Sequence, residues 1–300
     1  MRALPAFLIA ASLSCSSSAE AAPAPSTLRS GSPAFAAASA EWAAAAAEDG
    51  SASSGQAPAG MVLVPAGPFT MGRSGGPADE APAHAVQLPA FWIDRTLVTQ
   101  EAFARFLNAN PAGPHGPGGE RYFDMDDEDA RIHLKDGKWA ADPGFERHPA
   151  SEASLRGAAA YCAWAGKRLL SEAEWEKAAR GTDGRLYPWG NAPPSGRTGK
   201  LPRHHGDAAP VGSLPGGASF YGVLDMGAFL SEWTRSARRP YPYKTEDGRE
   251  SFSLTEDMVL RGGLTLGQRG PRTATHREAM TPRRARAGHA YVGFRCARGG

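Results

Sequence analysis

The chain has 300 residues, of which 41% are hydrophobic and 21% are charged. That is enough apolar material for one large or two small folded domains, and the 36 glycines and 25 prolines favour a fold with many loops. A formal charge of +2 gives no general reason to expect nucleic acid as a partner. No apolar run is long enough to span a membrane in the mature protein.

The N-terminus, residues 1–21, has the pattern of an export signal. Arg2 precedes a short apolar run, residues 4–13, and small residues follow it. Two processing routes stay open, namely cleavage near Ala21 by an ordinary signal peptidase and lipidation of Cys15 in an imperfect lipoprotein motif. Either route predicts an exported protein that is periplasmic, secreted or tethered to the cell envelope.

Residues 22–58 are rich in alanine, serine, proline and glycine. Such a segment buries too little apolar surface to offset its chain entropy, so it is expected to be a disordered tether. The folded domain is expected over residues 59–300.

The first elements of this domain are predicted to be short strands. Residues 61–64 and 69–72 flank a Pro/Gly-rich turn at 65–68, which predicts a hairpin. Further strands are expected at 85–88 and 91–94.

A helix is expected next, because Thr99 can cap it while Phe103 and Phe106 face inward. The acidic run at 124–129 favours a solvated loop over a calcium site, since it lacks the glycine and terminal glutamate of the EF-hand loop. Beyond it, Asp136-Gly137 predicts a tight turn between two strands.

Residues 157–191 predict a pair of helices. Gly166 ends the first, and Ser171 followed by Glu174 is the capping-box pattern that begins the second. Gly181 ends that second helix.

Two cysteines, Cys162 and Cys296, remain after either processing route consumes Cys15. In an exported chain two cysteines suggest one disulfide. Two separate buried thiols are the alternative.

Several motifs occur in a fixed order along the chain: Phe69-Thr70-Met71-Gly72, Phe91-Trp92-Ile93-Asp94, Tyr161-Cys162-Ala163-Trp164-Ala165-Gly166, Tyr187-Pro188-Trp189-Gly190-Asn191, Arg261-Gly262-Gly263 and Gly293-Phe294-Arg295. Together they resemble the formylglycine-generating enzyme family, also called sulfatase-modifying factors. The resemblance covers about residues 60–298. It implies an α+β, loop-rich fold that is related to C-type lectins and has little regular secondary structure. Vertebrate members carry a disulfide at the corresponding cysteines, so the resemblance implies a Cys162–Cys296 bond.

The family's catalytic cysteines are missing from this sequence. Family enzymes bind copper(I) through two cysteines between the Arg-Gly-Gly and Gly-Phe-Arg motifs, and use oxygen to convert a sulfatase cysteine into formylglycine. Counted from Gly263 without a gap, these positions fall on Gly267 and Arg272. Copper(I) prefers thiolates, so we expect no copper cofactor here.

A calcium-binding segment of the family is also altered. The family's Asp-Met-Ala-Gly-Asn-Val-Trp-Glu-Trp appears here as residues 225–233, in which Phe229 replaces the oxygen-donating asparagine. Glu232 remains. It either binds calcium weakly or, as we favour, accepts a buried hydrogen bond from backbone.

A basic stretch, residues 269–286, occupies the place of the copper site. Arginine forks match carboxylates and phosphates, so Arg272 and Arg277, with Trp233, are candidate ligand-binding residues. A solvated loop that pairs with nearby carboxylates is the equal alternative. The stretch has too few aromatic residues to stack nucleic-acid bases.

Three functions fit these observations. The first is an exported binding or accessory domain without copper chemistry, whose partner is an anionic small molecule or an envelope protein. The second is an enzyme that oxidatively tailors a secreted metabolite, with His276, Glu278 or Glu232 as candidate acid/base groups. The third is true formylglycine generation on sulfatases.

Overall fold

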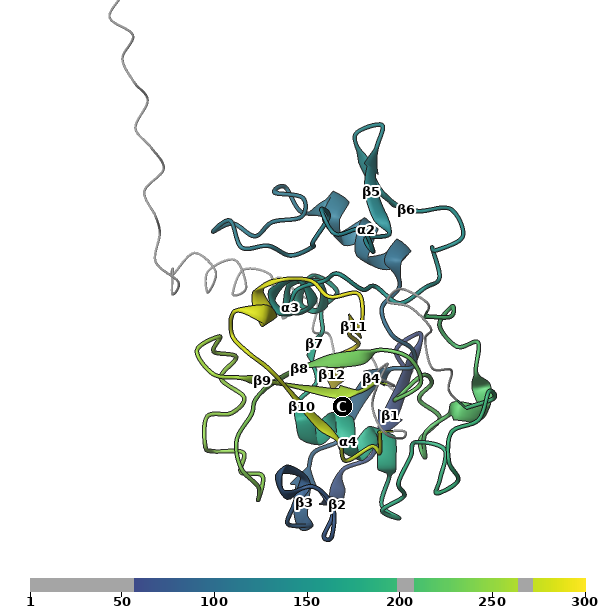
Figure 1. Ribbon diagram of the computed structural model, residues 1–300, viewed down its shortest axis with the longest axis vertical. Coiled ribbons are helices and arrows are strands. Elements are labelled where there is room, and N and C mark those ends of the chain that lie inside the picture. Colours follow the sequence, from purple (N-terminus) through teal and green to yellow (C-terminus); the bar gives the residue numbers. More distant parts are fainter. Residues whose placement is uncertain (1–56, 199–207, 264–271) are drawn as a thin grey trace, which may run out of the picture. The chain divides into compact units, whose positions relative to one another are not determined.

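The computed structural model describes residues 57–198, 208–263 and 272–300 (Figure 1). The predicted export signal, Cys15, nearly all of the tether and Gly267 lie outside these residues. Within them, no helix is both long and apolar enough to cross a membrane.

The described residues form short strands and three α-helices joined by long loops, so the predicted α+β, loop-rich fold is confirmed. The helices are α2 (Gln100–Ala109), α3 (Leu155–Trp164) and α4 (Glu172–Arg180). The strands are β1 (Met61–Val64), β2 (Gly67–Met71), β3 (His84–Leu88), β4 (Phe91–Asp94), β5 (Ile132–Lys135), β6 (Lys138–Ala141), β7 (Arg168–Leu169), β8 (Ser231–Ala237), β9 (Met258–Gly262), β10 (Arg277–Met280), β11 (Val292–Gly293) and β12 (Cys296–Gly299).

Two four-stranded sheets organise the strands, one in the order β1-β4-β12-β7 and one in the order β10-β9-β8-β11. The predicted hairpin between residues 61–64 and 69–72 is wrong, because β1 pairs with β4 and β2 pairs with β3. Val64 lies opposite Phe91, and Phe69 lies opposite Val86. Each strand thus buries its apolar residues against a partner further along the chain, a choice that a local turn signal cannot predict.

The local signals for the remaining elements are confirmed. The hydroxyl of Thr99 accepts a hydrogen bond from the backbone N–H of Ala102 at 3.2 Å and begins α2. Ser171 and Glu174 form the capping box of α4, which ends at Gly181 with a φ of +64°. The β5–β6 hairpin forms as well, and it lies beside α2 (Figure 1).

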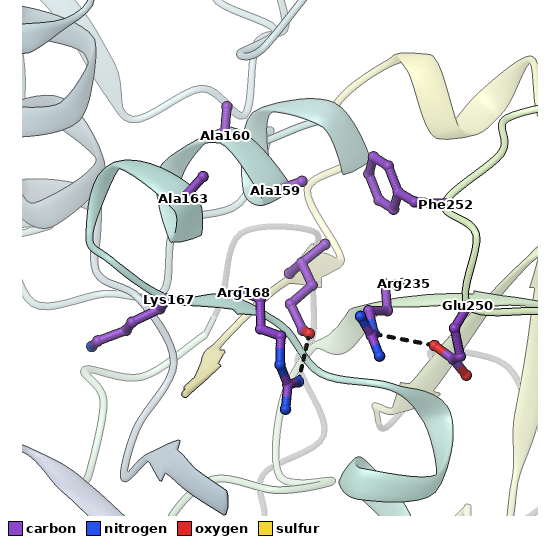
Figure 2. Close-up of a pocket in the computed structure, with 9 residues that line it drawn as sticks. Ala159, Ala160, Ala163, Lys167, Arg168, Arg235, Glu250 and Phe252 are labelled. Carbon is purple, nitrogen blue, oxygen red and sulfur yellow. Dashed lines mark hydrogen bonds and ion pairs between the residues drawn. The ribbon is translucent and has the colours of Figure 1, made fainter. Parts of the chain in front are cut away.

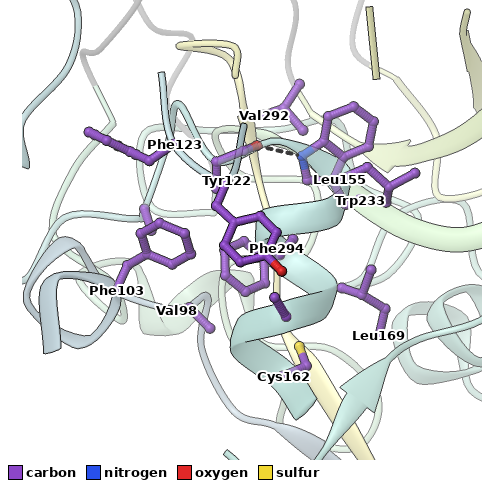
Figure 3. Packing of buried hydrophobic residues seen from close by; sticks show 14 of the residues in the cluster. Val98, Phe103, Tyr122, Phe123, Leu155, Cys162, Leu169, Trp233, Val292 and Phe294 are labelled. Atoms are coloured by element: carbon purple, nitrogen blue, oxygen red, sulfur yellow. Dashed lines mark hydrogen bonds between the residues drawn. The ribbon is translucent and has the colours of Figure 1, made fainter. Parts of the chain in front are cut away.

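Two apolar clusters form the core. The larger includes residues of α2, α3, β8 and β9, with Phe103, Trp233 and Phe294 among its buried side chains (Figure 3). The rings of Phe103 and Phe294 meet edge to face with their centroids 5.8 Å apart, a favoured aromatic geometry. The second cluster includes Trp175 of α4 and residues of β1 to β4.

The disulfide between Cys162 and Cys296 is present, which confirms that prediction. It joins α3 to β12, two elements 134 residues apart in sequence. Because β12 lies between β4 and β7, the bond ties the helix to the interior of a sheet.

Candidate functional site

Strand β10 presents charged side chains in two directions. Successive residues of a strand point to opposite faces. Accordingly, Arg277 contacts Glu172 of α4, whereas Glu278 contacts Arg272 and Ser231. The strand therefore separates a buried charge network from a more open ion pair.

The open pair includes Arg272, the position at which the count from Gly263 predicts the second copper-binding cysteine of the family. Arg272 Nη1 is 2.7 Å from Glu278 Oε2 and 3.4 Å from the hydroxyl oxygen of Ser231. The Arg272 side chain is 5% exposed and that of Glu278 is 27% exposed. This geometry leaves the Glu278 carboxylate within reach of solvent, while the guanidinium is mostly covered.

This site does not fit copper(I). A guanidinium stays positively charged and offers no lone pair to a metal, and its nearest partners are oxygen atoms rather than thiolates. The two cysteines of the described residues are consumed by the Cys162–Cys296 bond.

The buried network lies between α4, β9 and β10. Arg261 Nη2 is 2.5 Å from Glu176 Oε2, and Arg180 Nη1 is 2.7 Å from Glu176 Oε1. Arg277 donates hydrogen bonds from Nε and Nη2 to the two carboxylate oxygens of Glu172. All five side chains are less than 6% exposed. A buried network of this kind needs every member paired, because an unpaired charge in the interior is costly.

The guanidinium of Arg277 forms its hydrogen bonds with partners inside the protein. Besides Glu172, it donates to the backbone carbonyls of Asp79 and Arg239, and its guanidinium lies 4.1 Å from the ring centroid of Tyr241. These contacts give Arg277 a structural role in the buried network, and they direct its side chain away from Arg272.

The ionisation of the network follows from these contacts. Burial by itself lowers the pKa of Arg261, but Glu176, Tyr241 and Glu172 together raise it. Burial, reinforced by the negative charge of Glu172, raises the pKa of Tyr241 well above its ordinary value. The arginine is therefore held charged and the phenol neutral.

His276 lies near Glu80, with its Nδ1 3.7 Å from Glu80 Oε1. Burial raises the pKa of Glu80, but His276, the hydroxyl of Thr275 and the guanidinium of Arg73 lower it to about 2. His276 and Glu278 thus contact different partners, and the structure does not bring the predicted acid/base groups together.

Glu232 forms a buried ion pair. Arg295 Nε and Nη2 donate to its two carboxylate oxygens at 2.7 and 2.9 Å. The buried partner that we expected from the backbone is thus a guanidinium. Across residues 57–198, 208–263 and 272–300, no group of three or more His, Cys, Asp or Glu side chains is arranged to hold a metal ion. The acidic run at 124–129 is a mostly exposed loop, as favoured.

Trp233 belongs to the core. It is 1% exposed, and its indole Nε1 donates to the carbonyl of Ala153 at 2.9 Å (Figure 3). It therefore presents no face to a ligand.

Two polar residues of this region escaped the sequence analysis. Ser231 stands where the family motif has tryptophan, a signal that was present in the compared segment. Glu152 gave no signal, yet it is 1% exposed, has a φ of +59°, and both of its carboxylate oxygens lack hydrogen-bond partners. Burial, reinforced by the charges of Asp127, Asp124 and Asp129, raises the pKa of Glu152 to about 8.

Comparison with known proteins identifies the family to which this fold belongs. The family model described as a sulfatase-modifying factor enzyme 1-like domain matches residues 39–299. The chain belongs to this family. A formylglycine-generating enzyme of Streptomyces coelicolor is 32% identical over 284 residues, which cover 79% of this chain and 88% of that enzyme.

Other family relatives carry different names. The serine/threonine-protein kinase Pkn1 of Chlamydia trachomatis serovar L2 is 33% identical over 79% of this chain. The chain spans only 38% of that kinase's length. Among solved structures, PvdO from Pseudomonas aeruginosa superimposes with a TM-score of 0.54 and 25% identity, covering 80% of this chain and 94% of PvdO. One family scaffold therefore occurs in proteins with distinct names, and function has to be argued from the site.

Proposed function

We propose that this chain is an exported binding or accessory domain of the sulfatase-modifying factor family that does not generate formylglycine. The observation that carries the proposal is the Arg272–Glu278 ion pair, at 2.7 Å, in the place where the family chemistry needs a thiolate.

The cysteine inventory supports the same proposal. The sequence has three cysteines. Two of them form the Cys162–Cys296 disulfide, and the third, Cys15, belongs to the predicted export signal. A disulfide sulfur is not a thiolate, so the mature domain has no ligand pair of the kind that holds copper(I).

The exposed arginines of the basic stretch support an anionic partner. Arg283, Arg284 and Arg286 lie at the surface around a short 3-10 helix, Arg284–Arg286, whereas Arg272 and Arg277 are mostly buried. In the described part of the chain no carboxylate forms an ion pair with Arg283 or Arg286. Guanidinium groups without carboxylate partners favour carboxylate or phosphate ligands.

The decisive test is an activity assay. The purified chain is incubated with copper(I), oxygen and a cysteine-bearing sulfatase peptide, with the Streptomyces coelicolor enzyme as positive control. We expect mass spectrometry to find no aldehyde product with this chain. Aldehyde formation by this chain at a rate near that of the control would overturn the proposal.

A restored pair of thiols sharpens the assay. The G267C/R272C double variant is compared with the parent for copper(I) binding in competition with a chelator. We expect only the double variant to retain copper(I), because thiolates are its preferred ligands. Equal retention by the parent would mean that other residues hold the metal.

The anionic partner is tested with citrate as the probe in isothermal titration calorimetry. We expect the R283Q/R286Q double variant to bind citrate more weakly than the parent. R105Q is the matched control, because Arg105 is an exposed arginine of α2 that pairs with Glu101. If both variants weakened citrate binding equally, the binding would depend on the net charge of the protein rather than on the surface formed by Arg283 and Arg286.

Catalysis by other groups is the alternative function, as an enzyme that oxidatively tailors a secreted metabolite. The specific observation in its favour is the 27% exposure of Glu278, whose carboxylate is held by Arg272. Oxygen consumption with a candidate metabolite that disappears in E278Q would favour this alternative over a binding domain.

A further inference from the structure

A pocket of about 270 Å³ lies between α3, β7, β8 and the loop at residues 250–252 (Figure 2). It shares no residue with the Arg272–Glu278 pair. Binding at this pocket is therefore independent of the function proposed above.

One side of the pocket is apolar. Ala159, Ala160 and Ala163 of α3 present only methyl groups to it, and Leu169 and Phe252 complete this wall. Alanines at these helix positions leave open the volume that a larger side chain would fill. Phe252 has a φ of +56°, an unfavourable conformation for a bulky residue, and that conformation carries its ring to the pocket (Figure 2).

Arg235 supplies a positive charge on the opposite side. It lies in the irregular part of β8, where the pairing with β9 shifts register between Trp233 and Ala237. Such bulges turn a side chain away from the direction that a regular strand would give it. The backbone N–H of Arg235 donates to the carbonyl of Leu170 at 2.9 Å, which fixes this conformation.

The guanidinium of Arg235 forms an ion pair with Glu250, which also lines the pocket. Its Nε lies 3.2 Å from Glu250 Oε2, and the other carboxylate oxygen of Glu250 accepts hydrogen bonds from Ser236 at 2.6 Å and Tyr243 at 2.7 Å. The Arg235 side chain is 34% exposed. In the described residues, no acceptor forms a hydrogen bond with its two terminal nitrogens.

The other cations at the pocket are already engaged. Both terminal nitrogens of Arg168 donate to the Glu174 carboxylate, at 2.6 and 2.7 Å. Lys167 Nζ lies 2.6 Å from Asp94 Oδ1. Of the two guanidinium groups at the pocket, Arg235 is therefore the one whose terminal nitrogens are available to a ligand.

We propose that this pocket binds a small carboxylic acid with an apolar body, whose carboxylate is gripped by the terminal nitrogens of Arg235. The apolar body lies against the alanines of α3, Leu169 and Phe252. An arginine fork matches a carboxylate in two parallel hydrogen bonds, and the preset position of Arg235 lowers the entropic cost of forming them.

The volume of about 270 Å³ suits a small ligand. An aromatic ring or a branched chain with one carboxylate is of a size that this space accommodates.

The test uses the full chain and ligand-observed saturation-transfer NMR, with dissociation constants from titration. The probe is 3-phenylpropionate, compared with 3-phenylpropanol, which lacks the charge, and acetate, which lacks the apolar body. We expect 3-phenylpropionate to bind at least about tenfold more tightly than either. Equal binding of the alcohol, or no binding of the acid, would overturn the proposal.

Two variants locate the binding. R235Q removes the charge and A163L fills the apolar side, and each is expected to weaken 3-phenylpropionate binding by about tenfold or more. R105Q on α2 is the matched arginine control and is expected to leave it unchanged. Circular dichroism and thermal unfolding confirm that each variant is folded. Binding that persists in both folded variants would place the ligand elsewhere and refute the assignment.

Discussion

Two regions of the domain bury glutamates in opposite ways. Around α4, Glu172 and Glu176 are fully buried and are surrounded by guanidinium groups, and the nearby Glu80 has a pKa of about 2. In the other region, Glu152 is equally buried but its carboxylate has no hydrogen-bond partner, and its pKa is about 8. The depth of burial is the same, so the partners decide the ionisation state.

This difference has consequences for stability. The α4 network holds together only while each carboxylate keeps its arginine, so losing one partner strands a charge in the interior. Glu152 is stable in the fold as the neutral acid at neutral pH, because no donor compensates a negative charge there. The first region therefore depends on pairing and the second on protonation.

The largest effect is expected from breaking the paired region. R261M keeps most of the side-chain volume but leaves Glu176 and Glu172 without one of their cations. We expect a loss of about 3–5 kcal/mol in the free energy of unfolding, which denaturant titration measures. R105Q, which changes an exposed pair with Glu101, is expected to cost less than about 0.5 kcal/mol. Similar losses in the two variants would mean that the α4 network adds nothing beyond a surface pair.

A pH-dependent effect, of comparable size at most, is expected at Glu152. Because its pKa in the fold, about 8, is above its ordinary value of 4.5, the folded protein holds a proton that the unfolded chain releases. The contribution of Glu152 to the free energy of unfolding is therefore fully present below pH 4.5. It is lost as pH rises toward 8, by at most about 1.4 kcal/mol per pH unit. The charged groups that raise this pKa are Asp124, Asp127 and Asp129.

The neutral variant E152Q removes this titration. Relative to the parent, its free energy of unfolding should rise steadily between pH 4.5 and 8 and then level off. Denaturant titrations at a series of pH values measure the difference. A constant difference across this window would show that Glu152 does not change its proton occupancy on folding.

The smallest effect is expected at the Arg272–Glu278 pair. The carboxylate of this pair is 27% exposed, so water can solvate Glu278 when Arg272 is removed. We expect R272A to cost about 1 kcal/mol or less. If R272A lost as much free energy of unfolding as R261M, Arg272 would contribute to stability as the buried network does. The two faces of β10 would then not differ energetically.

Local signals predicted much of the fold. The capping box at Ser171 and Glu174, the turn at Asp136-Gly137 and the glycine at Gly181 all act within a few residues, so their geometry follows from the sequence alone. The hairpin predicted from residues 61–72 failed because strand pairing is decided by distant partners. The disulfide was predicted because the chain offers few cysteines and the family resemblance implied the pair.

The site was less predictable. Arg272, Arg277 and Glu278 are close in sequence, but only Arg272 and Glu278 form a pair. Arg277 points to the opposite side of β10, toward Glu172. Alternation along β10 points Arg277 and Glu278 to opposite faces, and packing against α4 then pairs Arg277 with Glu172.

The sequence by itself determined the family, the three helices and the first strands of the domain, because motifs and local signals span only a few residues. Only the tertiary structure decided which charges are paired. Glu152 shows this, because no local pattern indicates that both of its carboxylate oxygens are buried without hydrogen-bond partners. Charges interact through space, and the sequence alone does not give those distances.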